Sequence, residues 1–78
     1  MAEVHDFDAG DLGCGTGLPR EFLNQIRAVP VGHHLRAIVS DPAGREDLPA
    51  LARMLGHSVV SVETADDGRL LITVERVK

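Results

Sequence analysis

The chain contains one cysteine, Cys14, and it lies within a run of glycines, GDLGCGTG at residues 10–17. Four glycines in eight residues predict a loop. Apolar residues recur at helical spacing from Leu18 onward, so Cys14 comes just before the expected start of a helix. Unpaired N–H groups at a helix start carry partial positive charge, which favours a thiolate over a thiol. The sequence therefore predicts a nucleophilic cysteine in this loop.

The neighbours of Cys14 favour an accessible sulfur atom. Gly13 and Gly15 are too small to cover it, and Arg20 in the first helical turn adds positive charge. The competing interpretation is a buried cysteine that acts as a small apolar side chain. The glycine run is not a phosphate-binding loop, because no Lys-Ser/Thr pair follows Gly17 and the dinucleotide spacing is absent.

Other residue types that could do chemistry are scattered along the chain. None of the histidines His5, His33, His34 and His57 has helical metal-ligand spacing to another, and one cysteine alone cannot form a structural zinc site. The carboxylates are scattered: Asp6 and Asp8 lie on one face of the first strand, and most of the others lie in turns or at a helix start, where the helix dipole accounts for them. We therefore expect no metal, no cofactor and no acid–base pair.

Composition limits the function further. The chain has 78 residues, a net charge of −4 and 3% aromatic residues. We expect one domain over residues 1–78 with no deep cavity. Direct nucleic-acid binding is not expected, because neither a positive balance nor stacking aromatics are present. No apolar run reaches the roughly 18 residues of a membrane span. The acidic start is no signal peptide and a lone cysteine makes no internal disulfide, so we expect a cytoplasmic location.

Hydrophobic periodicity predicts the element order β-α-β-α-β-β. The expected strands are Val4–Asp8, Leu35–Ser40, Ser58–Thr64 and Arg69–Val77. The expected helices cover Leu18–Val29 and Leu48–Leu55, the second with Asp47 as its N-cap and Gly56 as its end.

Each predicted helix has one apolar stripe, so both are expected to cover the same face of a sheet. The fold class is then α+β, a two-layer α/β sandwich with a four-stranded mixed sheet and two helices on one face. The opposite face is expected to be partly exposed and mixed in character. Its polar members would be Arg36, Ser61, Glu63, Thr73 and Glu75, and its apolar members Val59, Leu71 and Val77.

These residues together resemble the TusA family, also called SirA-like, of small sulfur-carrier proteins. The resemblance is carried by Gly10–Cys14, Asp41-Pro42, Asp47-Leu48-Pro49 and Gly56-His57, and it extends from Phe7 to Val77. It implies a β-α-β-α-β-β sandwich similar to the C-terminal domain of translation initiation factor 3.

The resemblance also implies an activity. Cys14 matches the family cysteine that accepts sulfane sulfur as a persulfide from a cysteine desulfurase or a rhodanese. The sulfur then passes to a downstream acceptor protein, in tRNA thiolation, molybdenum cofactor supply or sulfur oxidation. Such a protein is a sulfurtransferase-type relay without turnover of its own.

The sequence departs from the family in the motif that contains the cysteine. The family has Cys-Pro-x-Pro, whereas this chain has Cys14-Gly15-Thr16-Gly17. Glycine makes this loop more flexible than proline would. The site predicted from the sequence is Cys14 with a supporting loop of Gly13, Gly15, Thr16, Gly17 and Arg20. The departure leaves open a non-catalytic interaction or regulatory module on the same fold. RNA binding rests only on analogy with the initiation-factor fold.

Overall fold

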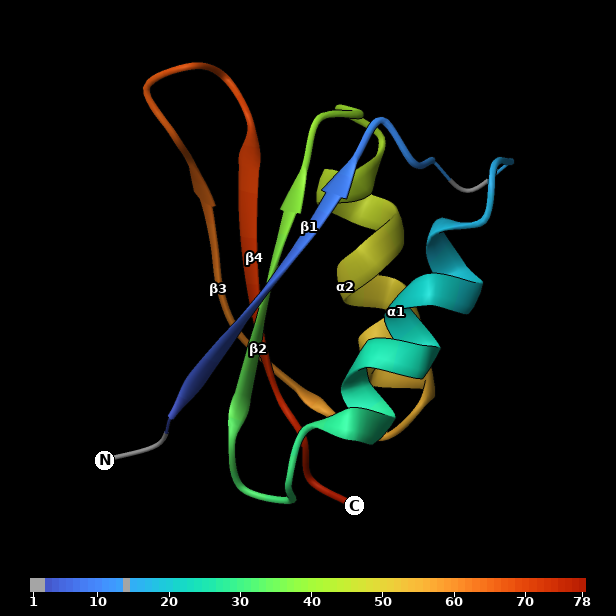
Figure 1. The fold of residues 1–78 in the computed structure, drawn as a ribbon, viewed down its shortest axis with the longest axis vertical. Coiled ribbons are helices and arrows are strands. Elements are labelled where there is room, and N and C mark those ends of the chain that lie inside the picture. The colour runs from blue at the N-terminus through green and yellow to red at the C-terminus, as the bar shows by residue number, and fades with distance from the viewer. Residues whose placement is uncertain (1–2, 14) are drawn as a thin grey trace.

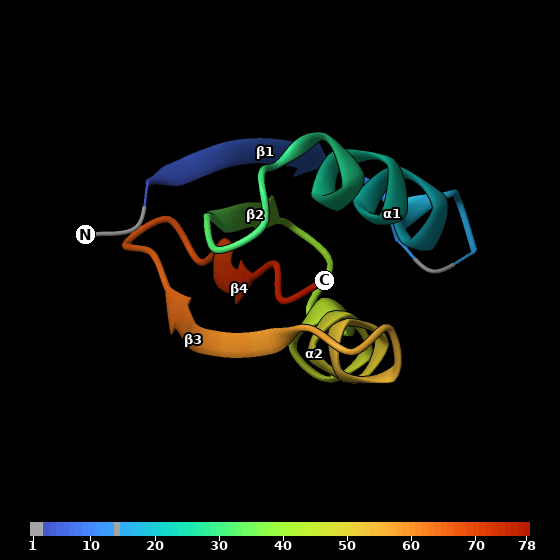
Figure 2. The ribbon, with the colours of Figure 1, turned by 90° about the horizontal axis from the view of Figure 1, so that it is seen from below.

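The elements of the fold follow one another in the predicted order, β-α-β-α-β-β. The structure is a computed structural model, and it describes residues 3–13 and 15–78. The strands are β1 (Val4–Gly10), β2 (His34–Val39), β3 (Ser58–Thr64) and β4 (Leu70–Glu75), and the helices are α1 (Leu18–Ala28) and α2 (Gly44–Met54). The sheet order is β1-β2-β4-β3, with β1 parallel to β2 and the other pairs antiparallel. Both helices cover one face (Figures 1 and 2), which confirms the predicted two-layer α+β sandwich.

The core lies between the helices and the sheet. The predicted stripe of α1 is buried throughout, from Leu18 through Phe22 and Ile26 to Val29 just after the helix. Leu48 and Ala52 are buried on α2. The sheet contributes alternate residues of its central strands: Leu35, Ala37, Val39, Leu70, Ile72 and Val74. This alternation arises because successive strand residues point to opposite faces.

The second helix begins earlier than the sequence indicated. Asp47 is not its N-cap, because α2 starts at Gly44 and its N-cap is Ala43. The turn at Asp41 already puts the Ala43 backbone in the right-handed helical region, so the helix continues directly from it. The Ala43 N–H donates to the Asp41 carboxylate at 3.0 Å. A Cβ on Gly44 would lie 2.8 Å from Val39 Cγ1, so glycine lets this first turn lie close to β2.

The open face of the sheet differs from the prediction in three residues. Val59 packs against the core, because the register of β3 shifts between Val59 and Ser61. The extra residue of this bulge lies between them, so Val59 points to the helix-covered face and not to the open face. Thr73 faces away from the helices but is only 9% exposed, since β4 lies inside the sheet. Val77 lies beyond the end of β4.

Arg76 fastens the chain after β4 to the end of α1. Its guanidinium donates to the carbonyl oxygens of Arg27 at 2.8 Å and Val29 at 2.7 Å. Its backbone N–H donates to the His33 carbonyl at 3.0 Å, and its own carbonyl accepts the Gly32 N–H at 2.8 Å. The carbonyl groups at the end of α1 therefore have a charged donor.

Replacing Arg76 with methionine is expected to lower the free energy of unfolding by about 1.5–3 kcal/mol, because charged hydrogen bonds to helix carbonyls are lost. Arg53→Met, in the exposed last turn of α2, is the matched control and should cost less than about 1 kcal/mol. Urea unfolding followed by circular dichroism measures both. Equal losses in the two variants would contradict this role of Arg76.

Candidate functional site

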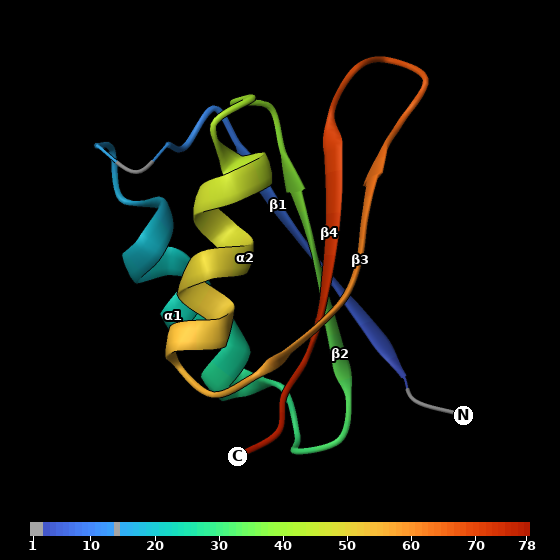
Figure 3. The same ribbon diagram turned by 180° about the vertical axis from the view of Figure 1, so that it is seen from behind.

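The predicted site loop lies at the edge of the sheet where two parallel strands end. Parallel strands end at the same edge, so the loop after β1 and the turn after β2 are neighbours there (Figure 3). The Ser40 N–H donates to the Gly10 carbonyl at 3.2 Å. Gly13 is buried, and a Cβ on it would lie 2.6 Å from Asp41 Oδ2. Glycine at position 13 therefore lets the Asp41 carboxylate lie against the loop.

Hydrogen bonds join the parts of the loop on either side of position 14. The Gly13 N–H donates to Thr16 Oγ1 at 2.7 Å, and the Gly13 carbonyl accepts the Thr16 and Leu18 N–H groups, both at 3.0 Å. The Leu12 N–H donates to the Ala9 carbonyl at 3.1 Å. Gly13 and Thr16 thus hold the loop to the start of α1. Cys14 itself lies outside the described residues, so its exposure stays a prediction.

Gly17 determines how the backbone enters α1. It is the N-cap, with φ of 106°, and Pro19 follows in the first turn. Proline is fixed near φ −65° and cannot adopt this conformation. The glycine found here, where the family motif has proline, therefore changes the path of the backbone into the helix as well as its stiffness.

The remaining predicted site residues lie on the surface. Gly15, Thr16, Gly17 and Arg20 are exposed, and Arg20 is in the first turn of α1. The adjacent Glu21 accepts a hydrogen bond from Gln25 at 3.1 Å. The structure therefore presents the loop after position 14 to solvent, whereas the buried residues Gly13 and Leu18 anchor it. No pocket is found among residues 3–13 and 15–78.

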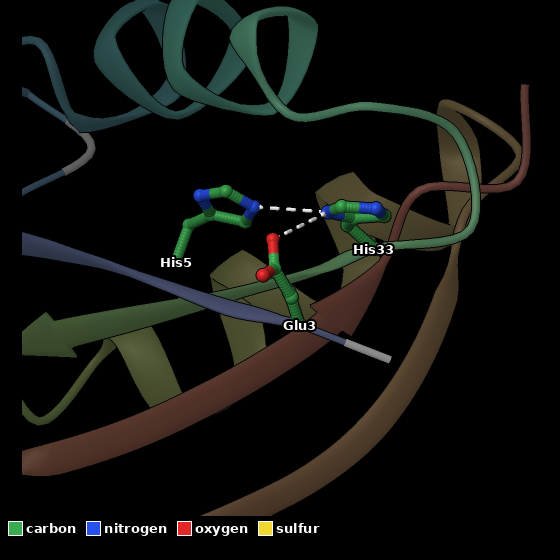
Figure 4. A group of neighbouring side chains, drawn as sticks. All are labelled: Glu3, His5 and His33. Atoms are coloured by element: carbon green, nitrogen blue, oxygen red, sulfur yellow. Dashed lines mark hydrogen bonds and ion pairs between the residues drawn. The ribbon is translucent and has the colours of Figure 1, made fainter. Parts of the chain in front are cut away.

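Two histidines that are 28 positions apart meet at the opposite end of β1. His5 Nε2 lies 3.1 Å from His33 Nδ1, and Glu3 Oε2 lies 3.6 Å from the same nitrogen. Figure 4 shows these side chains converging between β1 and the loop that precedes β2. The cluster was not predicted from the sequence, because His5 and His33 do not have the spacing of metal ligands on one helix. The parallel pairing of Val4 with His34 is what brings the residues together.

His57 is tied to the C-terminal segment. Its Nδ1 accepts the Val77 N–H at 3.1 Å, and its backbone N–H donates to the Ala52 carbonyl at 2.9 Å. Burial lowers the pKa of His57 below its usual 6.5, and the positive charges of Arg76 and Lys78 lower it further. The folded chain therefore favours the neutral ring.

This lowered pKa predicts a loss of stability in mild acid. The unfolded chain binds a proton at His57 more readily than the folded chain, so the stabilisation is complete above 6.5 and is lost as the pH falls below it. Urea unfolding measures the free energy of unfolding at about pH 7.5 and about pH 5.5. Between these two pH values, that free energy should fall less in His57→Gln than in the original chain. If the free energy of unfolding fell equally in the two proteins, His57 would not be the source of the pH dependence.

Among the described residues, neither helix is long and apolar enough to cross a membrane. No family model matches the chain.

Individual relatives do match the chain. It is 35% identical over 72 residues to a protein of Pseudomonas syringae pv. syringae (strain B728a) named sulfur carrier protein TusA, covering 91% of this chain and 82% of the relative. A protein of the same name from Pseudomonas savastanoi pv. phaseolicola is 36% identical over 59 residues, with 74% and 69% covered. A putative sulfur carrier protein of Archaeoglobus fulgidus is 38% identical over 48 residues, 62% of each chain.

Proposed function

Because the chain belongs to the TusA family of sulfur carrier proteins, we propose that it carries sulfane sulfur as a persulfide on Cys14. The observation that carries this proposal is the identity of 35% over 91% of the chain with a protein named as a sulfur carrier. The predicted site supports it, since the sequence has one cysteine and places it between hydrogen-bonded loop residues at the start of a helix.

The proposed reaction is a thiol exchange between two proteins. The Cys14 thiolate attacks the outer sulfur of a cysteine persulfide on the donor. The sulfur–sulfur bond of the donor breaks, a new one forms on Cys14, and the donor cysteine leaves as a thiolate. Electrons balance without an added oxidant. An acceptor protein then takes the outer sulfur from Cys14.

The charge and the exposure of the described loop residues both bear on this reaction. The partial positive charge at the start of α1 would stabilise the thiolate, with Arg20 in the first turn as an additional positive charge. Gly15, Thr16 and Gly17 are exposed and small, so this part of the loop would enter the active site of a partner. The Asp41 carboxylate, which lies against Gly13, adds a negative charge to the same loop, so the loop combines both signs of charge.

The partners we propose are a cysteine desulfurase or a rhodanese as donor and a sulfur-accepting protein downstream, in the cytoplasm. A single cysteine suits this relay, because a second thiol in the same chain would displace the bound sulfur as a disulfide formed. The family resemblance implies tRNA thiolation, molybdenum cofactor supply or sulfur oxidation as the route that receives the sulfur.

Sulfur loading tests the proposal directly. The reduced chain is incubated with a cysteine desulfurase and cysteine, and separately with a rhodanese and thiosulfate, and its intact mass is then measured. We expect a gain of one sulfur atom that a reductant removes. A desulfurase without its own active cysteine is the control. No gain with several donors, with Cys14 shown to be reduced, would contradict the proposal and favour a non-catalytic interaction module.

A further inference from the structure

We propose that Glu3, His5 and His33 form a binding site for a divalent transition-metal ion of the Zn²⁺ class. Each residue offers one ligand atom, and the three atoms lie within 4.8 Å of one another. Two imidazole nitrogens and one carboxylate oxygen are a donor set that such ions accept. The site is separate from the proposed sulfur carriage, because it lies at the other end of β1 from the Cys14 loop (Figure 1).

Two of the three distances between the donor atoms are close to those around one ion. Zinc–nitrogen and zinc–oxygen bonds of about 2.0–2.2 Å place neighbouring ligand atoms of a tetrahedral site roughly 3.3–3.6 Å apart. His5 Nε2 and His33 Nδ1 are 3.1 Å apart, and His33 Nδ1 and Glu3 Oε2 are 3.6 Å apart. The three atoms lie within 4.8 Å of one another, so the side chains would turn toward a shared centre when the ion binds.

The chemistry of the three groups also favours an ion between them. His33 Nδ1 faces both His5 Nε2 and the Glu3 carboxylate. Without a metal, one proton on a ring nitrogen can make the 3.1 Å hydrogen bond, whereas 3.6 Å is too long for a good second one. A divalent ion would use a lone pair from each of the three groups, and it would offset the negative charge of Glu3.

The backbone holds the three residues in place before any ion binds. The Glu3 carbonyl accepts the His34 N–H at 2.8 Å, and His5 pairs with Leu35 in the parallel ladder. His33 is held by hydrogen bonds to Pro30 at 3.0 Å and to Arg76 at 3.0 Å. A site on a preformed sheet loses little conformational entropy when it binds.

The cluster lies on the helix-covered face, past the end of α1. Glu3 and His5 alternate with the buried Phe7 along the same face of the chain, but α1 ends at Ala28 and leaves this end uncovered. The His33 side chain is 32% exposed and that of Glu3 is 75% exposed. Three protein ligands with solvent access leave a fourth position for water or for a ligand from a partner.

A zinc titration of the full chain without an affinity tag tests this site. Calorimetry is done at about pH 7.5, because a ligand must lose its proton before it binds the metal. Cys14→Ser serves as the background in a parallel titration, because a thiolate is itself a zinc ligand. We expect one equivalent of Zn²⁺ in both proteins. In the Cys14→Ser background, His5→Ala and His33→Ala should each weaken binding at least about tenfold, and Glu3→Gln should weaken it less.

The matched control is His34→Ala, which removes a histidine next to the cluster that supplies no ligand atom to it. It should bind Zn²⁺ as the background does. Nuclear magnetic resonance should show the ring signals of His5 and His33 shifting together on Zn²⁺ addition, with those of His34 and His57 unchanged. Absence of one-equivalent binding, or equal weakening by His34→Ala and His5→Ala, would overturn the proposal and leave a plain hydrogen bond between two histidines.

Discussion

Cys14→Ser is expected to abolish sulfur loading completely. Serine is close to cysteine in size but has no sulfur, so no sulfur–sulfur bond can form on it. Since Cys14 is the one cysteine in the sequence, no other side chain can replace it. Intact mass after incubation with the donor enzyme measures the effect, and the variant should keep the mass of the unloaded protein.

A relocated cysteine makes this test specific for the loop. Ser58 is an exposed residue at the start of β3, so Cys14→Ser combined with Ser58→Cys presents a thiol on a different surface. We expect little loading of this double variant, because the relocated thiol has neither the loop nor the helix start beside it. Loading as fast as that of the original chain would mean that the loop around position 14 contributes nothing to recognition by the donor.

Phe22→Ala is expected to lower the free energy of unfolding by about 3–5 kcal/mol. Phe22 has no exposed surface and is the largest of the fully buried side chains, between α1 and the sheet. Removing its ring loses apolar burial and leaves a cavity that the small core cannot fill. Because a chain this small has a stability of roughly 4–12 kcal/mol, this loss removes about a quarter of it or more.

Thermal unfolding followed by circular dichroism measures this loss, since the chain has no tryptophan or tyrosine for fluorescence. We expect the melting temperature to fall by at least about 12 °C. Phe22→Leu, which keeps an apolar side chain, should lose less than half as much stability. A loss below about 1 kcal/mol in Phe22→Ala would contradict the packing of α1 on the sheet.

The fold was predictable because local patterns carry it. The spacing of Leu18, Phe22, Ile26 and Val29 has the period of a helix, and all four are buried as expected. Glycine at position 56 marks the end of the second helix in sequence, and its φ of 88° shows why glycine is needed there. The start of α2 was not predictable in this way. Asp is common both in turns and at helix N-caps, so Asp41 and Asp47 could not be told apart from the sequence.

Part of the site was predictable for a similar reason. Glycines on both sides of one cysteine are a signal within eight consecutive residues, and the described neighbours do form a loop at the start of a helix. The approach of Asp41 to Gly13 had no such signal, because it depends on two parallel strands ending at one edge. The bulge in β3 that turns Val59 toward the core was also invisible in the alternation of residues.

The sequence by itself determined the element order, the apolar stripes and the place of the cysteine between a strand and a helix. These depend on interactions between residues a few positions apart. Only the tertiary structure decided which distant side chains meet: Asp41 with Gly13 at one end of β1, and Glu3, His5 and His33 at the other. The physical reason is that strand register sets these contacts, and register depends on the packing of the whole sheet.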